Sequence, residues 1–376
     1  MFVNMGIGLI MPITTLYVHN SLHKSLVVAG YVLLAFSGAM TVGNLIGGRL
    51  FDTWKQKATM FLGGGMQITG LILLALFPSW PVYAVLLVLY GLGLGILNSA
   101  VNGYLAFLNR EDANIFNNGY WMANIGMGIS TFLSGILFDI NIRLIFASSA
   151  VLFLLTLLLI KFKFRGFNTR SSGHSLAAKN HKRGLTNDVG IILVCLTMII
   201  IWICYEQWNS NVSVLMTGQG ISVRKYSMLF TISTVEIAIL QPFLTRLFHN
   251  SFTADKLRVI LGVIIFACSY LMIVRASDYW RFILGITLVS VGEILALTAI
   301  PILLNRYASD RNRGTLQSLG SLSGSLGRAL GPLSGGWLIT SLGYNDTFLI
   351  FFAAHVVIAA ILLLIRRPQA VIEKNG

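Results

Sequence analysis

Long apolar stretches separated by short polar segments run from one end of the chain to the other. A helix needs about 20 residues to cross a bilayer, and twelve stretches come close to that length. They cover residues 2–18, 27–47, 58–78, 82–105, 117–138, 143–161, 188–207, 226–247, 258–275, 280–303, 315–338 and 345–365. The pattern predicts an all-α membrane protein with twelve transmembrane helices.

The segment between the sixth and seventh stretches divides the chain. Residues 162–187 are polar, basic and contain serine, a composition typical of a flexible linker. We therefore predict a six-helix bundle in residues 1–161 and a second one, followed by a short tail, in residues 188–376.

Composition supports a membrane protein over a soluble one. Of the 376 residues, 56% are hydrophobic and 11% are charged, more apolar surface than one soluble core could bury. The net charge of +14 comes from short basic clusters between apolar stretches. This favours contact with anionic lipid headgroups, and we expect no nucleic-acid partner.

The distribution of Lys and Arg predicts the orientation. Of 27 such residues, 20 lie in segments that follow even-numbered stretches or in the C-terminal tail, and six lie in the opposite loops. Basic loops stay on the cytoplasmic side of a membrane. We therefore expect a multi-pass protein of the cell membrane with both termini and the linker in the cytoplasm.

The chain carries signs of an internal duplication. Arg49-Leu50-Phe51 recurs as Arg246-Leu247-Phe248, 197 positions later, and Leu133-Ser134-Gly135 recurs as Leu333-Ser334-Gly335, 200 positions later. Each match falls after an equivalent number of apolar stretches. The two six-helix bundles are therefore predicted to be copies of one unit.

The polar segment 47–57, expected to be a loop between the second and third helices, contains Gly48, Leu50, Asp52 and Lys57. This arrangement resembles the signature loop of the major facilitator superfamily of secondary transporters. The resemblance implies two pseudo-symmetric six-helix bundles that rock about a midplane site. It also implies that Asp52 acts as a latch on the cytoplasmic side; the alternative is that it only balances Lys55 and Lys57 at the surface.

Three ionisable residues lie about halfway along apolar stretches: Glu236, Glu293 and Arg328. A charge at that depth costs about 2.5–3.5 kcal/mol on insertion scales, so each should face a partner or a wet cavity. One interpretation is that a carboxylate takes up and releases a proton, with Glu293 the main candidate. The other is a static buried ion pair that holds the second bundle together.

Two further motifs resemble transporters of the same superfamily. Gly292-Glu293, followed by Ile300-Pro301, resembles a pattern in the tenth helix of proton-coupled multidrug exporters. The string from Gly327 to Gly336, with Gly331-Pro332 at its centre, resembles one that drug antiporters carry in the fifth helix. Here it lies in the eleventh stretch, where it predicts either a bending gate helix or close packing alone.

Polar and aromatic residues at helical spacing predict the walls of a substrate cavity. Such stripes suit a flat or cationic ligand, although Asn side chains also hydrogen-bond between helices without any ligand. Glu206, near the outer end of the seventh stretch, is either a cation-binding group or a solvated carboxylate at the rim. The predicted cavity residues are Asn98, Asn102, Tyr120, Trp121, Asn124 and Glu206.

These features together favour a proton-coupled exporter of lipophilic or cationic small molecules. The alternative is a carrier of one specific metabolite, a sugar or an organic anion, with Arg328 as a ligand of the substrate carboxylate. A transport-inactive sensor on the same scaffold is a third class, but the chain has no extra soluble domain. No nucleotide loop, metal cluster or haem motif is present, so we expect no cofactor and no enzymatic activity. The superfamily is usually monomeric.

Overall fold

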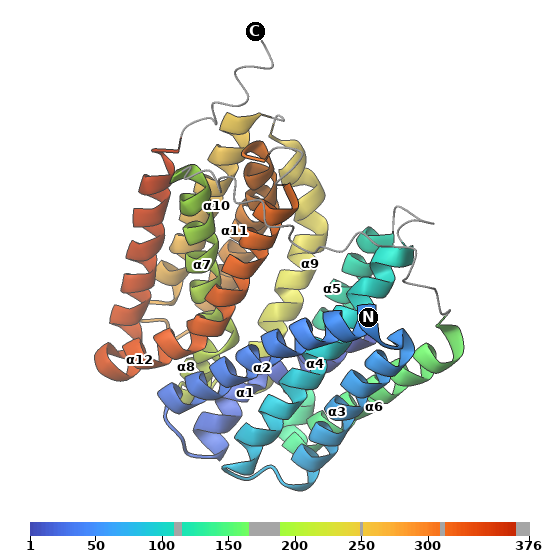
Figure 1. The fold of residues 1–376 in the computed structure, drawn as a ribbon. Helices are drawn as coiled ribbons and strands as arrows, with labels where there is room; N and C mark the ends of the chain where they lie inside the picture. The colour runs from blue at the N-terminus through green and yellow to red at the C-terminus, as the bar shows by residue number, and fades with distance from the viewer. Residues whose placement is uncertain (109–114, 165–188, 249–250, 309–312, 366–376) are drawn as a thin grey trace. The chain divides into compact units, whose positions relative to one another are not determined.

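The computed structural model describes all residues except 109–114, 165–188, 249–250, 309–312 and 366–376. The described residues form helices joined by short connections (Figure 1). The helices are α1 (Phe2–Leu16), η1 (Tyr17–Ser21), α2 (Leu26–Thr53), α3 (Gln56–Leu76), α4 (Val82–Leu108), α5 (Ile115–Ile140), α6 (Ile142–Lys163), α7 (Val189–Asn209), α8 (Asn211–Gly218), α9 (Val223–Arg246), α10 (Phe252–Ile273), α11 (Tyr279–Arg306) and α12 (Arg313–Leu362).

These helices account for twelve membrane crossings. Within the described residues, ten helical stretches are long and apolar enough to span a bilayer, and α5 contributes a shorter apolar segment. The stretch Thr315–Leu362 counts twice because Gly343, with a φ of 82°, interrupts it. Only glycine adopts such a φ without strain, and Figure 1 shows two rods of α12 meeting at a sharp turn. The predicted all-α fold with twelve crossings is confirmed.

The predicted loop at residues 47–57 is wrong in its extent. Helix α2 continues to Thr53, so that Gly48 and Asp52 lie on its last turns and only Trp54 and Lys55 separate it from α3. Hydropathy marks the part of a helix that lies in hydrocarbon, whereas the hydrogen-bonded ladder continues into the headgroup region. For the same reason α4 and α11 extend beyond their predicted limits.

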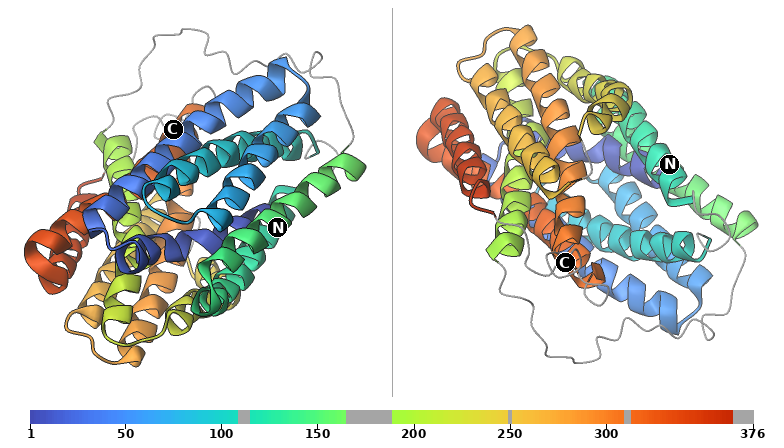
Figure 2. Two further views of the ribbon diagram at one scale, coloured as in Figure 1. Left: turned by 90° about the horizontal axis from the view of Figure 1, so that it is seen from below. Right: turned by 90° about the horizontal axis from the view of Figure 1, so that it is seen from above.

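The chain divides into two compact units. Unit 1 comprises Met1–His23 and Tyr31–Gly184, and unit 2 comprises Lys24–Gly30 and Leu185–Gly376. In unit 1, α3 packs along α4 and α6, and α1 packs along α5 and α6. In unit 2, α10 packs along α11 and α12, α7 along α12, and α9 along α11 (Figure 2).

Equivalent contacts recur in the two units at a spacing of 199 residues. A β-carbon on Gly63 of α3 would come within 2.9 Å of the Gly93 carbonyl oxygen of α4, and one on Gly262 of α10 within 2.9 Å of the Gly292 oxygen of α11. Glycine at these four positions lets the helix backbones touch. Their spacing of 199 residues lies between the spacings of 197 and 200 found for the repeated tripeptides, so both observations indicate the same duplication.

Two lysines, also 199 residues apart, make equivalent contacts at one end of each unit. Lys57 Nζ donates to the Lys161 carbonyl at the end of α6, at 2.8 Å, and Lys256 Nζ donates to the Leu363 and Ile365 carbonyls after α12, at 2.7 and 2.8 Å. Carbonyls at a helix C-terminus lack intrahelical partners, so each lysine caps the last helix of its own unit.

Candidate functional site

Unit 2 brings four of the predicted residues onto neighbouring helices. Glu206 lies on α7, Glu236 on α9, Glu293 on α11 and Arg328 on the first part of α12. Glycines set the distance between α7 and α12: a β-carbon on Gly327 would meet the Ile199 carbonyl oxygen at 2.6 Å, and one on Gly331 the Ile203 oxygen at 2.9 Å. These glycines therefore allow the polar residues of the two helices to come close together.

Arg328 packs against an aromatic ring of α7. Its guanidinium carbon lies 4.2 Å from the centre of the Trp202 ring, a distance at which a cation is attracted to the ring face. It is also close enough to Glu206 for electrostatic attraction. Asn209 Nδ2 donates to Glu206 Oε2 at 3.3 Å. A cation, an anion and an aromatic surface thus lie together along one side of α7.

Glu206 lies near the end of α7, as the sequence predicts. Helix α7 ends at Asn209, and α8 begins at Asn211 after a turn at Ser210, so that the apolar stretch runs from Val189 to Gly218. The Ser210 backbone N–H and hydroxyl both donate to the Glu206 carbonyl at this turn. The Glu206 side chain is half-buried.

Glu293 forms no ion pair with another described residue. Tyr205 of α7 lies near its carboxylate, while Glu293 Oε2 is buried and has no hydrogen-bond partner in the described part of the chain. Among those residues the one ion pair within 4 Å joins Arg306 and Asp255, at 2.9 Å. Glu293 and Arg328, both described residues, therefore do not form the static ion pair that was the alternative prediction. Arg328 instead lies against Trp202 and close to Glu206.

Glu236 belongs to a ladder of polar contacts between α9 and α11. Thr287 Oγ1 donates to Glu236 Oε1 at 2.6 Å, and Ser290 Oγ lies 2.8 Å from Ser233 Oγ one turn away. Glu236 Oε2 is buried without a partner among the described residues. These bonds fix α9 against α11.

Sequence analysis did not select Trp202 and Tyr205. Both lie on α7, three and four residues from other members of the cluster, and their rings meet at 5.1 Å in an edge-on arrangement. The spacing of Trp202, Tyr205 and Glu206 on one helix surface was the available signal. It was hidden because α7 is apolar on all sides, so that no polar stripe distinguishes one face.

The predicted gating residues of α12 lie next to this cluster. The Gly331 carbonyl accepts hydrogen bonds from Gln207 Nε2, at 2.8 Å, and from Ser334 Oγ, at 2.9 Å. Pro332 follows within the helix, where it cannot donate to the carbonyl one turn earlier. The bending role of Gly331 and Pro332 stays a prediction.

In unit 1, Asn98 and Asn102 lie on α4, half-buried and exposed respectively. Gly48 lies near Ser99 of α4, and Asp52 is exposed. No ion pair joins Asp52 to another described residue, and Lys57 caps α6 instead. The side chains of three further predicted residues on α5 lie outside the described part: Tyr120, Trp121 and Asn124.

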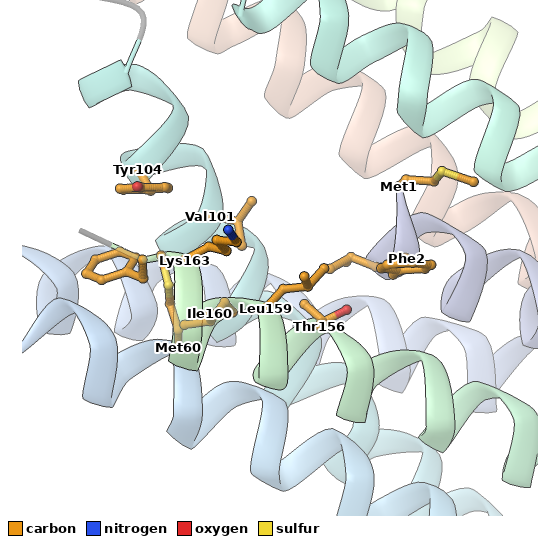
Figure 3. A pocket seen from close by; sticks show the side chains of 11 residues that line it. Met1, Phe2, Met60, Val101, Tyr104, Thr156, Leu159, Ile160 and Lys163 are labelled. Carbon is orange, nitrogen blue, oxygen red and sulfur yellow. The ribbon is translucent and has the colours of Figure 1, made fainter. Parts of the chain in front are cut away.

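A cavity of about 290 Å³ lies elsewhere in unit 1. Figure 3 shows its lining, which includes Phe2 of α1, Met60 of α3, Tyr104 of α4 and Lys163 of α6. None of the predicted substrate-cavity residues contributes to it. The cavity is therefore separate from the ionisable cluster, which is the better candidate site.

Comparison with known proteins agrees with the fold. The family model of the Major Facilitator Superfamily matches residues 1–208 and again 191–376. The chain is 30% identical to the uncharacterized MFS-type transporter YttB of Bacillus subtilis (strain 168), covering 100% of this chain and 96% of that protein. It is 23% identical to the quinolone resistance protein NorA of Staphylococcus aureus (strain COL), covering 89% and 86%.

Solved structures share the architecture at low identity. A mutant of the peptide transporter POT superposes with a TM-score of 0.79 and 16% identity, covering 96% of this chain and 91% of that one. The nucleoside transporter NupG gives 0.75 and 12%, covering 97% and 96%. At this identity the likeness concerns the fold alone. With the family model matching both halves, the chain belongs to the major facilitator superfamily of membrane transporters.

Proposed function

We propose that this transporter exports lipophilic or cationic small molecules in exchange for protons, by alternating access in the cell membrane. Both termini face the cytoplasm in this proposal, as the distribution of Lys and Arg indicates. The quinolone resistance protein among its relatives supports a drug-like substrate. The peptide and nucleoside carriers share only the fold and do not favour the alternative of one specific metabolite.

The observation that carries the proposal is the environment of Glu293. Its carboxylate lies in the middle of α11, near the phenol of Tyr205, and one of its oxygens is buried without a hydrogen-bond partner among the described residues. An anion held this way is costly in a low-dielectric medium, and binding a proton removes the charge. Glu293 is thus suited to exchange a proton when its surroundings change from one side of the membrane to the other.

The groups beside Glu293 suit a lipophilic cation. Trp202 and Tyr205 offer aromatic faces, and Glu206 offers a negative charge that Arg328 only partly balances, because no ion pair within 4 Å joins the two. A cationic substrate gains attraction to both the rings and the carboxylates. Protonation of Glu293 removes part of that attraction and so favours release.

Gating in this proposal uses parts of both units. Gly331 and Pro332 allow α12 to bend next to Glu206, because the proline leaves one backbone hydrogen bond of the helix unmade. Asp52, exposed at the end of α2, engages basic groups when the cytoplasmic side is closed, together with Gly48 and Lys57. This latch is carried over from the resemblance of the 48–57 segment to the superfamily pattern.

The decisive test is efflux of a lipophilic cationic dye from everted vesicles under an imposed proton gradient. We expect Glu293→Gln, which keeps size but cannot ionise, to abolish proton-driven efflux while the protein stays folded and membrane-inserted. Asp278→Asn serves as the control, because Asp278 is exposed at the start of α11. Gradient-driven efflux by the Glu293→Gln variant at the wild-type rate would refute the role of Glu293.

A substrate panel separates the two candidate functions. A drug exporter should move several unrelated lipophilic cations, whereas a metabolite carrier should move one sugar or organic anion and ignore the dyes. Transport of a single anionic metabolite, with strict dependence on Arg328, would replace the export proposal with the alternative.

A further inference from the structure

Arg328 has hydrogen-bond donors that no other described residue uses. It lies halfway along the first part of α12, and its side chain is exposed. It forms no ion pair with another described residue and donates no hydrogen bond to one. Its guanidinium carbon lies 4.2 Å from the centre of the Trp202 ring. A guanidinium carries its five N–H donors in one plane, so contact with a ring face leaves those donors available to a ligand.

The exposed side chains of this part of α12 lie on two different sides of the helix. Leu322, Leu326 and Leu330 recur every four residues and form one apolar row. Arg328 is two residues away from each of the last two leucines, a rotation of about 200° around the helix. It shares its side with Ser321, which is exposed seven residues earlier. The leucine row suits acyl chains, whereas a charge at this depth is costly in hydrocarbon. Arg328 therefore faces water or a polar ligand.

The contact between α7 and α12 brings a carboxylate near this guanidinium. A β-carbon on Gly327 would meet Trp202 Cβ at 2.6 Å, and one on Gly331 would meet Glu206 Cβ at 2.7 Å. One turn of α7 is thus in register with one turn of α12. Arg328 directly follows Gly327, so the cation and the carboxylate lie about one turn apart along the same contact. No ion pair within 4 Å joins them, and each charge can still bind a ligand group.

These groups suit the two ends of a single molecule. The planar fork of an arginine binds a carboxylate through two parallel hydrogen bonds, and the face of the guanidinium turned away from Trp202 can stack on a flat ring. The carboxylate of Glu206 attracts an ammonium or a charged ring nitrogen. The matching ligand is an aromatic ring system that carries both a carboxylate and a cationic nitrogen.

We propose that Arg328, supported by Trp202, forms a carboxylate-binding subsite, and that together with Glu206 it selects aromatic zwitterions among the substrates of the exporter. This inference rests on the proposed function and narrows its substrate class. It differs from the metabolite alternative, because the carboxylate is bound together with a cationic group on a lipophilic ring and not on its own.

The test compares three acridines with the same cationic ring system: 9-aminoacridine, 9-aminoacridine-4-carboxylic acid and the methyl ester of that acid. The ester keeps the bulk of the carboxylate but lacks its charge. The ratio of the dissociation constants of the ester and the acid therefore measures what the negative charge contributes. Fluorescence titration of the purified full-length protein in phosphatidylcholine nanodiscs gives the three constants.

We expect the wild-type protein to bind the acid about tenfold more tightly than the ester, the effect of charge-assisted hydrogen bonds. Arg328→Gln should reduce this ratio to about one, while continued binding of 9-aminoacridine shows that the variant is folded. Arg328→Lys should give an intermediate ratio, because an ammonium pairs with a carboxylate without the planar fork. Trp202→Leu, which removes the supporting ring, should also lower the ratio.

Arg246→Gln is the matched control. It removes an exposed guanidinium at the end of α9 and should leave the tenfold ratio unchanged. Glu206→Gln should weaken the binding of all three acridines, because each carries the cationic ring.

Equal affinities for the acid and the ester in the wild-type protein overturn the inference, as does a preference that survives in Arg328→Gln. Loss of the preference in Arg246→Gln as well overturns it too, because the effect is then not specific to the site. A preference that depends on Arg328, in a protein that exports no lipophilic dye under a proton gradient, contradicts the proposed function and supports the subsite. Gradient-driven dye efflux without a preference for the acid has the opposite meaning.

Discussion

Arg328 shows how a single residue can satisfy a charge at mid-membrane depth without an ion pair. Its guanidinium lies 4.2 Å from the Trp202 ring centre and within electrostatic range of Glu206. A flat guanidinium stacks on a ring in a way that a compact ammonium cannot. Both the charge and the shape of Arg328 therefore matter to the site, and two substitutions separate them.

We expect Arg328→Lys, which keeps the charge near Glu206 but loses the stacking, to weaken dye efflux by about 2- to 30-fold, since cation–π contacts contribute roughly 0.5–2 kcal/mol. Arg328→Gln should weaken it further, because Glu206 then has no nearby cation. Initial rates of efflux at several dye concentrations measure both effects. Wild-type rates in Arg328→Lys would mean that charge alone is sufficient.

At the scale of helices, backbone contact through glycine organises both units. The pairs Gly63–Gly93 and Gly262–Gly292 bring α3 against α4 and α10 against α11 with the same geometry. Gly65, two residues from Gly63, has no atom within 4 Å of the place where its β-carbon would be. Neighbouring glycines of α3 thus have different roles, and substitution distinguishes them.

Gly63→Ala should destabilise unit 1 by about 1–3 kcal/mol, because its β-carbon meets the backbone of α4 and a well-packed contact must shift. Gly65→Ala should be neutral or stabilise the helix by up to about 1 kcal/mol, since alanine favours helix over glycine. Thermal unfolding of the purified protein in detergent, followed by tryptophan fluorescence, compares the two. Gly262→Ala should repeat the effect of Gly63→Ala, and equal melting temperatures for Gly63→Ala and Gly65→Ala would contradict this account.

The sequence predicted the helices well and the contacts of individual side chains poorly. The twelve crossings follow from apolar length alone, and the break near Gly343 fell between the predicted spans 315–338 and 345–365. The end of α2 was missed because its polar last turns remain helical, and the short helix α8, which follows the turn at Ser210, was not predicted. The neighbour of Arg328 was also missed, since the rotation of one helix about its axis relative to the next leaves no pattern in a uniformly apolar sequence.

At the scale of the whole molecule, the two units share a backbone plan but not their chemistry. At the spacing of 199 residues that relates Gly93 to Gly292, the equivalent of Glu293 is Leu94, which is fully buried. The duplicated contacts are those that pack helices, whereas the mid-span carboxylate is present in one copy. We therefore expect the proton-binding step to depend on unit 2, with unit 1 contributing packing and the Asp52 segment.

The orientation of the whole chain is tested by labelling single cysteines in intact cells. In a variant without Cys195, Cys204 and Cys268, Ser277→Cys, between α10 and α11, should react with a membrane-impermeant maleimide added outside. Thr53→Cys, at the end of α2, should react only after permeabilisation, because basic residues lie beside it and we expect basic segments to stay in the cytoplasm. Both positions are exposed, so access and not burial decides the result. Labelling of Thr53→Cys from outside would mean that the chain has the opposite orientation to the one predicted. Proton exchange through Glu293 would then have to run against the direction proposed for export.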